Sequence, residues 1–336
     1  MRVWFNHWFS TAYHLINLIR DGNPGQFTVI GSSTNSSAIY QRVCEEWYTE
    51  PDDLGADEYA AFCLEFCRKH GIDIFVPRRN MTAVVEHYND FAALGVKVMA
   101  DTDASKISLL DDKRKTYEFF KTKGSTCVPE IRIAHSLEEF DAAYQELKKV
   151  STRVCYKLVV DEGVRSFRVV DDRMESPSAL LEKPGTKVTL AATRRVLGGY
   201  DFSIPILLMP YLSEVEISVD CLATSSGDLI IPRYKTGKRY SEVIFSREVM
   251  KLCGEMMDLL GMKMPMNIQF KKEQGKLYLL EINPRMSGGL QLSCKASGIN
   301  LPSIAINQLL DTEVPWGYPN FERQKVANIE TPICLY

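Results

Sequence analysis

The sequence predicts an α/β protein that begins with a parallel sheet and continues into a region rich in strands. From residue 1 to about residue 104, short apolar runs alternate with helical patterns, which is typical of strands joined by crossover helices. After residue 154 strand-like segments dominate, and residues 215–221 alternate apolar and polar side chains. A chain of 336 residues is long enough for two or three domains around a large apolar interior.

Composition limits the partners that we expect. The chain is 45% hydrophobic and 25% charged with a formal net charge of −3, so its bulk charge favours neither nucleic acid nor a membrane surface. Its nine cysteines suggest neither a metal site nor a disulfide framework. The amino terminus has no apolar core of signal-peptide length, and the longest apolar stretch, residues 204–212, is too short to span a bilayer. We therefore expect a cytoplasmic protein with small-molecule partners. The sequence leaves its oligomeric state open, and a homodimer is one possibility.

Polar residues follow two of the predicted strands of the first region. Asn6 and His7 come directly after one apolar run, and Arg78 and Arg79 come after another. In parallel sheets ligands collect at the carboxyl ends of the strands, so these four side chains are candidates to contact a small substrate. Solvated loop residues are an equally open interpretation, because arginines are common on surfaces. The four predicted strands are residues 2–5, 27–32, 73–77 and 96–100.

Capping residues mark two helices in the middle of the chain. Asp111 and Asp112 suit the positive end of a helix that closes at Gly124. Ser136 and Glu139 form a capping box ahead of a helix that runs to about residue 150. A third apolar stripe predicts a helix at residues 246–260. Further strands are predicted at residues 129–133, 154–160, 166–170, 206–212, 215–223, 229–234, 266–270 and 277–281.

The last two of these strands carry a cluster of oxygen donors. Asn267 and Gln269 are two residues apart, as are Glu281 and Asn283, so each couple points to one face of its strand. Mg²⁺ takes carboxylate and amide oxygens and shares its remaining positions with water and substrate phosphates. The pattern predicts a magnesium-nucleotide site. A polar strand end that is hydrogen-bonded to a loop is the structural alternative.

An ordered set of motifs resembles the ATP-grasp superfamily, in particular the ATP-grasp modules of carbamoyl phosphate synthetase large subunits and related carboxylate-amine ligases. The motifs extend over nearly the whole chain: "DDKRKTYEFFKTKG", "CYKLVV", "LMPYLSEVEISVD", "NIQF", "LLEINPRMSGG" and "SCKASGINLPSIA". The resemblance implies an ATP-grasp fold preceded by a parallel α/β (pre-ATP-grasp) domain. It implies three parts: the amino-terminal domain at 1–104, linker helices and a small lid at 105–212, and a carboxyl subdomain with the metal site at 213–336.

The resemblance assigns the metal and phosphate contacts. It implies that Gln269, Glu281 and Asn283 are ligands of Mg²⁺ or Mn²⁺, with Glu281 bridging two ions, and that Lys157 and Lys113 reach ATP phosphate oxygens. Lys157 also lies within an apolar strand, where an unpaired ammonium would be costly, so it needs an anionic partner. For Lys113, a solvated residue in a charge-rich turn is the alternative.

Adenine and ribose contacts are implied in the next segment. Residues 209–212, with Met209, Tyr211 and Leu212, would form a hinge whose backbone groups meet adenine, and Glu216 would accept hydrogen bonds from the ribose hydroxyls. These four residues complete the implied ATP site.

Two arginines are implied to handle the reacting groups. Arg285 would hold the activated acyl group or its phosphate, because a guanidinium offers two parallel donors to an oxyanion. Arg233 follows a strand, where family members often hold substrate or phosphate with an arginine, and a solvated loop is its alternative. Arg285, Lys157 and Arg233 are thus the implied catalytic residues.

The chain departs from the family pattern just after Lys157. The family has a glycine-rich loop there, whose backbone amides approach phosphates, whereas "VDEGVRSFRVV" contains only Gly163. Arg165 and Ser166 are candidate replacement donors, and a looser phosphate clamp is equally open. The departure puts the phosphate-handling detail in doubt.

The function implied by the resemblance is ATP-dependent, ADP-forming ligation of a carboxylate to an amine or related nucleophile through an acyl phosphate. This chemistry depends on positioning and electrostatics, so it needs no nucleophilic side chain. A nucleotide-binding regulatory protein without turnover and a carboxyl kinase without ligation are the alternatives. A dehydrogenase is disfavoured, because "FNHWFST" after the first strand lacks a G-x-G-x-x-G pattern.

Overall fold

A computed structural model describes residues 1–160, 165–176, 179, 185–329, 332 and 334 of the chain. The loop expected around Gly163 therefore lies largely outside the described residues. The chain divides into two compact units. Unit 1 contains Met1–Ser108, Glu216–Gln269 and Ile282–Tyr336, and unit 2 contains Leu109–Val215 and Phe270–Glu281. Within the described part of the chain, no helix has the length and apolar character needed to cross a membrane.

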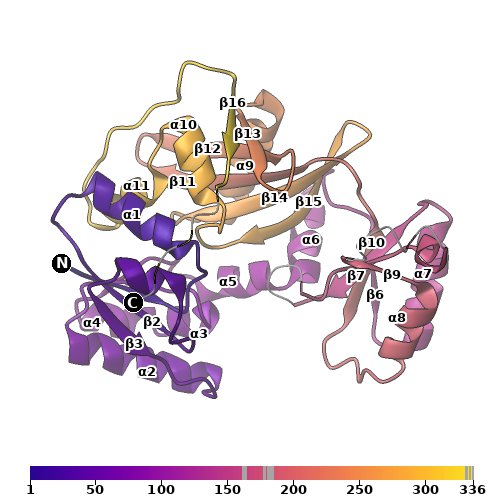
Figure 1. Ribbon diagram of the computed structural model, residues 1–336, viewed down its shortest axis with the longest axis horizontal. Helices are drawn as coiled ribbons and strands as arrows, with labels where there is room; N and C mark the ends of the chain where they lie inside the picture. Colours follow the sequence, from indigo (N-terminus) through magenta and orange to yellow (C-terminus); the bar gives the residue numbers. More distant parts are fainter. Residues whose placement is uncertain (161–164, 177–178, 180–184, 330–331, 333, 335–336) are drawn as a thin grey trace. The chain divides into compact units, whose positions relative to one another are not determined.

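A five-stranded parallel sheet forms the amino-terminal part of unit 1 (Figure 1). The order of its strands is β3 (Glu46–Thr49), β2 (Thr28–Ser33), β1 (Arg2–Asn6), β4 (Ile74–Val76) and β5 (Lys97–Val98). The predicted parallel sheet is confirmed, and the apolar runs form its buried strands. Its helices are α1 (Ala12–Gly22), α2 (Ala56–His70), α3 (Met81–Glu86), α4 (Tyr88–Ala93) and α5 (Ala104–Asp111), with a short 3₁₀ helix at Ile39–Val43.

Unit 2 is built around a second five-stranded sheet. Two helices, α7 (Leu137–Lys148) and α8 (Leu190–Leu197), contribute Phe140, Leu147 and Leu197 to its small apolar core. The Ser136 side chain caps α7 by accepting from the Glu139 amide at 3.2 Å, as the capping box predicts. Helix α6 (Lys113–Thr122) belongs to this unit, and a 3₁₀ helix spans Asp172–Glu175. The strand order is β6 (Arg132–Ala134), β10 (Ile206–Pro210), β7 (Val154–Leu158), β8 (Arg168–Val170) and β9 (Lys187–Val188).

The third sheet has six strands, and its two long strands β14 and β15 include residues of both units. A turn with Gln274 and Gly275 at positive φ joins β14 to β15. Helices α9 (Arg247–Leu260), α10 (Leu290–Ser297) and α11 (Leu301–Leu309) complete the carboxyl part. The strand order is β15 (Lys276–Asn283), β14 (Met266–Glu273), β11 (Glu216–Thr224), β12 (Gly227–Lys235), β13 (Tyr240–Ile244) and β16 (Arg323–Ala327).

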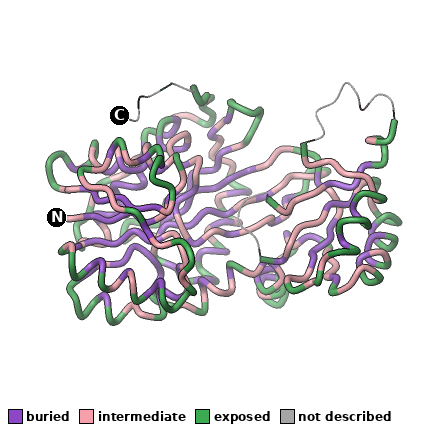
Figure 2. Tube along the Cα trace, turned by 60° about the horizontal axis from the view of Figure 1, so that its bottom comes forward, coloured by how far each residue is buried: buried purple, intermediate pink, exposed green. Residues whose placement is uncertain are grey.

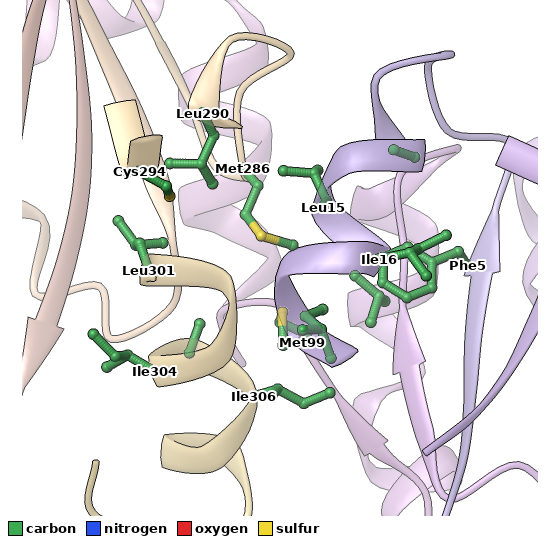
Figure 3. Packing of buried hydrophobic residues seen from close by; sticks show 14 of the residues in the cluster. Phe5, Leu15, Ile16, Met99, Met286, Leu290, Cys294, Leu301, Ile304 and Ile306 are labelled. Atoms are coloured by element: carbon green, nitrogen blue, oxygen red, sulfur yellow. The ribbon is translucent and has the colours of Figure 1, made fainter. Parts of the chain in front are cut away.

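The two ends of the sequence share one apolar core within unit 1. Leu15 and Ile16 of α1 pack in the same cluster as Leu290 of α10 and Ile304 of α11 (Figure 3). Met286, from the loop after β15, lies among them. In Figure 2 the buried residues form the inner stretches of the tube, and the exposed residues lie mainly on its outer bends. This core holds the loop that follows β15 against the amino-terminal domain.

Candidate functional site

The predicted metal ligand Gln269 belongs to a buried hydrogen-bond network of unit 1. Its amide Nε2 donates to Asn267 Oδ1 at 3.1 Å, and Asn267 Nδ2 donates to Asp220 Oδ1 at 2.9 Å. Asp220 Oδ2 accepts from Ser293 Oγ at 2.6 Å. The polar face of β11, expected from its alternation, is therefore not solvated: Ser218 and Asp220 are buried against β14 and α10.

Arg233 is also buried, with a 4% exposed residue surface, although it is a cation at the end of β12. Its Nε donates to Ser293 Oγ at 3.2 Å, and no carboxylate forms an ion pair with it in the described part of the chain. The backbone of Gly289 lies against the guanidinium, since a Cβ at that position would be 2.2 Å from Nη2. Burial excludes the solvated-loop interpretation for Arg233, whereas Lys235, the next cation on β12, is exposed.

Asn283 and Arg285, at the end of β15, contact each other and the loop after β1. Arg285 Nη2 donates to Asn283 Oδ1 at 3.2 Å, and its Cζ lies 4.7 Å from the centroid of the Phe9 ring. Arg78 stacks on the same ring, with Cζ at 4.1 Å. Two guanidinium groups therefore contact one aromatic ring. The distance between their Cζ atoms is no greater than the sum of these two distances, which is about one Debye length (~8–10 Å), so salt does not fully screen the two charges from each other.

Arg79 differs from Arg78. Its side chain is 16% exposed, lies 3.8 Å from the fully buried carboxylate of Glu50, and donates to the carbonyls of Pro51 and Asp52. These contacts give Arg79 a structural role. Its predicted place in a substrate site therefore has no support in the geometry, while Arg78 lies on the same ring as Arg285 and its place in the site stays a prediction.

Asn6 also has a structural role. Its Oδ1 accepts from the Arg78 amide at 2.7 Å and its Nδ2 donates to the Tyr59 hydroxyl at 2.8 Å. The buried Asn6 side chain thus holds the backbone of Arg78 at the carboxyl edge of the sheet. His7, the next residue, has a backbone φ of 45°, an unfavourable value for a residue with a Cβ.

In unit 2, helix α6 brings Lys113 to the predicted metal ligand Glu281. Lys113 Nζ lies 3.9 Å from Glu281 Oε2, and its side chain is only 5% exposed. One turn later the Tyr117 hydroxyl donates to the Leu280 carbonyl at 2.6 Å, and burial raises the pKa of this phenol. Because Lys113 is buried, its interpretation as a solvated turn residue is wrong. The sequence left that interpretation open because it shows the neighbouring acids but not the strand onto which α6 packs.

The predicted hinge and Lys157 also lie in unit 2. Met209 is buried on β10, which lies between β6 and β7, and is opposite Cys155 of β7. Burial raises the pKa of Cys155 to about 12, and the Lys157 ammonium two residues along opposes this shift. The Tyr211 amide donates to the Arg153 carbonyl at 2.9 Å, and the Arg153 guanidinium stacks on the Tyr211 ring. The hinge is thus tied to the start of β7, and Leu212, the last hinge residue, is also buried.

Glu216, the predicted ribose acceptor, is the first residue of β11 and forms an ion pair with Lys235. Its side chain is partly exposed, so its oxygens remain accessible to a ligand. Lys235 is the last residue of β12.

The donor set suits a hard cation. The side-chain atoms of Gln269, Glu281 and Asn283 that can bind a cation are all oxygens. Glu281 and Asn283 are two residues apart on β15, which directs both side chains to one side of the strand. Within the part of the chain that the structure describes, no group of three or more His, Cys, Asp or Glu residues could hold a metal. A cation here would therefore depend on amide oxygens and on ligand phosphates as well as on Glu281.

Sequence reasoning missed Asp220, Ser293 and Phe9 as site residues. For Asp220 the signal was present: a polar face on a strand next to the asparagine and glutamine of β14. For Ser293 and Phe9 no local signal exists, because they reach Arg233 and Arg285 only through tertiary packing.

The fold and the oxygen-rich strand pair resemble those of ATP-grasp proteins, and comparisons with known proteins agree. Residues 202–332 match the family model described as "ATP-grasp in the biosynthetic pathway with Ter operon". The chain is 22% identical over 320 residues to the carbamoyl phosphate synthase large chain of Clostridium perfringens (strain 13 / Type A), covering 82% of this chain and 30% of that protein. The chain thus spans about a third of that relative's length. These matches confirm the resemblance to the ATP-grasp superfamily.

Solved structures share the fold. The biotin carboxylase domain of Hydrogenobacter thermophilus 2-oxoglutarate carboxylase, in complex with MgADP, ADP and bicarbonate, matches with a TM-score of 0.63 at 14% identity, covering 94% of this chain and 70% of that one. The L-amino acid ligase of Bacillus licheniformis matches with a TM-score of 0.63 at 15% identity, covering 92% of this chain and 74% of that one. The predicted ATP-grasp fold is therefore confirmed.

Proposed function

We propose that the protein is an ADP-forming ligase that joins a carboxylate to an amine or a related nucleophile through an acyl phosphate. The observation that carries the proposal is the buried guanidinium of Arg233, which has Ser293 as a hydrogen-bond partner and no carboxylate as a counter-charge in the described part of the chain. A buried cation of this kind is stabilised by an anionic ligand. A carboxylate and its phosphorylated form are such ligands.

We propose the nucleotide contacts residue by residue. Met209, Tyr211 and Leu212 would contact adenine, and Glu216 would exchange its Lys235 partner for the ribose hydroxyls. Lys113 and Lys157 would offset phosphate charge. The MgADP complex of the 2-oxoglutarate carboxylase domain supports the same nucleotide and cation for this chain.

The reaction would proceed in two steps. A carboxylate oxygen attacks the γ-phosphorus of ATP and ADP leaves; then the amine nitrogen attacks the acyl carbon, inorganic phosphate leaves and the amine loses a proton. Gln269, Glu281 and Asn283 would hold Mg²⁺ or Mn²⁺, which supplies positive charge where phosphoryl charge develops. Arg233 and Arg285 would orient the carboxylate and its acyl phosphate by charge-assisted hydrogen bonds.

The acceptor side would be the ring of Phe9 with Arg78 and Arg285. Their two positive charges suit a substrate that carries its own anionic group next to the reacting carboxylate or amine, such as an amino acid. The amino acid ligase among the structural matches is consistent with this class. A cytoplasmic location and a homodimer remain part of the proposal; the biotin carboxylase domain of the 2-oxoglutarate carboxylase is a dimer in its crystal structure.

The test is ATP turnover with a panel of amino acids as both carboxylate and amine, followed by release of ADP and phosphate and by mass spectrometry of the product. A ligase releases phosphate only when both substrates are present. A carboxyl kinase would release ADP without the amine, and hydroxylamine would trap its acyl phosphate as a hydroxamate. A regulatory protein would show a thermal shift with Mg²⁺ and ATP, about 2.7 kcal/mol of stabilisation at ~100 times the dissociation constant, and no turnover.

Glu281→Gln provides the specific variant, because it keeps the shape of the side chain and removes its charge. Turnover should fall roughly 10²–10³-fold. Glu255→Gln, an exposed acid on α9, is the matched control and should leave turnover unchanged. A Glu281→Gln protein with normal turnover and normal Mg²⁺ dependence would contradict the proposed function.

A further inference from the structure

One buried carboxylate connects a predicted metal ligand to a predicted substrate arginine. The chain of hydrogen bonds runs from Gln269 through Asn267 to Asp220, and from Asp220 through Ser293 to Arg233. All five residues belong to unit 1. Asn267 and Ser293 are fully buried, and Asp220 is 2% exposed, so water does not compete for these bonds.

The chemistry of its neighbours fixes which way the Asn267 amide points. One end of this amide lies 3.1 Å from the Val219 carbonyl oxygen and 2.9 Å from Asp220 Oδ1. A carbonyl and a carboxylate only accept hydrogen bonds, so this end must be the NH₂ group. The other end is then Oδ1, whose partners are the Ser218 hydroxyl and the Gln269 amide.

The orientation of Asn267 in turn fixes that of Gln269. Because Asn267 presents an oxygen at 3.1 Å, the Gln269 atom that meets it must be the NH₂ nitrogen. The oxygen of Gln269 is therefore the end that is turned away from the network. A divalent cation binds an amide oxygen and is repelled by an amide NH₂ group, so this orientation decides whether Gln269 can act as a ligand.

The second arm of the network orients Arg233. Ser293 has one hydroxyl hydrogen, and the 2.6 Å contact assigns it to Asp220 Oδ2. The Ser293 oxygen then accepts from Arg233 Nε at 3.2 Å, which leaves both terminal nitrogens of the guanidinium for other partners. Such a fork matches the two oxygens of a carboxylate or an acyl phosphate.

We propose that Asp220 is the positioning residue that aligns the metal ligand Gln269 with the substrate arginine Arg233. The inference rests on the proposed function, because it assumes that Gln269 meets the cation and that Arg233 meets the substrate. Asp220 touches neither ligand, and its effect passes through Asn267 on one side and through Ser293 on the other.

The experiment measures Mn²⁺ binding by electron paramagnetic resonance in the presence of a non-hydrolysable ATP analogue. Asp220→Asn removes the negative charge and one of the two acceptor oxygens, so Asn267 and Ser293 no longer both have an acceptor and the hold on Gln269 is weakened. The Mn²⁺ affinity should fall about 10–100-fold, the usual effect of losing an outer partner of a metal ligand. Asp228→Asn on β12 is the control for losing a half-buried acid and should bind Mn²⁺ like the parent.

A charge swap separates orientation from stability. In Asp220→Asn combined with Asn267→Asp, Asn at position 220 donates to the new carboxylate, whose second oxygen accepts from Gln269 and restores its orientation. The swap should recover Mn²⁺ affinity relative to Asp220→Asn, even where its melting temperature is lower because the carboxylate now faces the Val219 carbonyl. Recovery of affinity without recovery of stability is not expected of a purely structural residue.

Ser293→Ala tests the other arm without altering Gln269. It should raise the KM for the carboxylate substrate and leave the Mn²⁺ titration unchanged. If Asp220→Asn does not fold, the swap and Ser293→Ala still decide the matter. A swap that binds Mn²⁺ no better than Gln269→Ala, or a Ser293→Ala protein with the parent KM, would overturn the positioning role.

Glu281→Gln distinguishes the two levels of failure. If it weakens Mn²⁺ binding while Asp220→Asn does not, the metal site stands and only the positioning role of Asp220 is wrong. If Glu281→Gln and Asp220→Asn both bind Mn²⁺ like the parent, the proposed metal site itself is wrong, and so is the positioning role of Asp220.

Discussion

Adding one methyl group at Gly289 should displace the Arg233 guanidinium and disable carboxylate use. A Cβ at position 289 would lie 2.2 Å from Nη2 and 2.7 Å from Cζ of Arg233, whereas ordinary van der Waals contact begins at 3.4 Å. The guanidinium must therefore move by about 1 Å, and a misplacement of this size can cost about 10²-fold in rate. A loss of 10²-fold in kcat/KM corresponds to about 2.7 kcal/mol of transition-state stabilisation.

The clash is with the far end of a side chain, so the backbone of the loop can remain in place. Gly289→Ala should therefore cost no more than the ~1–3 kcal/mol of stability typical of overpacking, and ATP should still raise its melting temperature. The assay is steady-state phosphate release against the concentration of the carboxylate. Gly288→Ala is the neighbouring control, because its Cβ would meet Thr11 Oγ1 at 3.4 Å, and it should lose much less activity. Equal kcat/KM values for the two variants would refute the reasoning.

Three other predictions follow from contacts within each unit. Arg79→Ala should lower the free energy of unfolding, measured in urea, by roughly 3 kcal/mol, because it leaves the fully buried carboxylate of Glu50 without its counter-charge. Arg78→Ala should chiefly impair substrate binding. The reverse pattern would contradict both assignments. Lys113→Met keeps the buried stem and removes the charge beside the metal strand, so the ATP dissociation constant from calorimetry should rise, and an unchanged value would remove Lys113 from the site. Hydrogen bonds from Arg173 lower the pKa of Asp171 to about 2, below its ordinary value of 3.8, so this carboxylate contributes stability above pH ~4 that is lost as the pH falls towards 2. In Asp171→Asn the free energy of unfolding in urea should therefore depend less on pH between about 4 and 2. A dependence identical to that of the parent would exclude the contribution.

The sequence predicts the strands of the fold where local pattern and burial agree. Four apolar runs became β1, β2, β4 and β5, and the capping box at Ser136 begins α7. Strand β3 was missed because it is only four residues long, although Trp47, Tyr48 and Thr49 favour strands; it pairs with β2, and its Glu46 forms an ion pair with Arg2. The three-part domain division stays a prediction.

The candidate site is predictable only where residues are close in sequence. Glu281 and Asn283 are related by strand periodicity, and Arg233 stood out as the cation nearest a strand end. The burial of Lys113 and the separation of Arg78 from Arg79 depend on which strand or acid each meets in three dimensions, and no local pattern contains that information.

The shared core of the two chain ends has a consequence for synthesis. The apolar face of α1 is complete before residue 23, yet its partners on α10 and α11 are about 280 residues further along the chain. At ~5–20 residues per second, Leu15 and Ile16 leave the ribosome roughly 15 to 60 s before Leu290 and Ile304 can cover them. During that interval the part of α1 that α10 and α11 later cover stays exposed, even though residues of β1 and β2 belong to the same core, so the protein should depend on chaperones in the cell more than its folded stability would suggest.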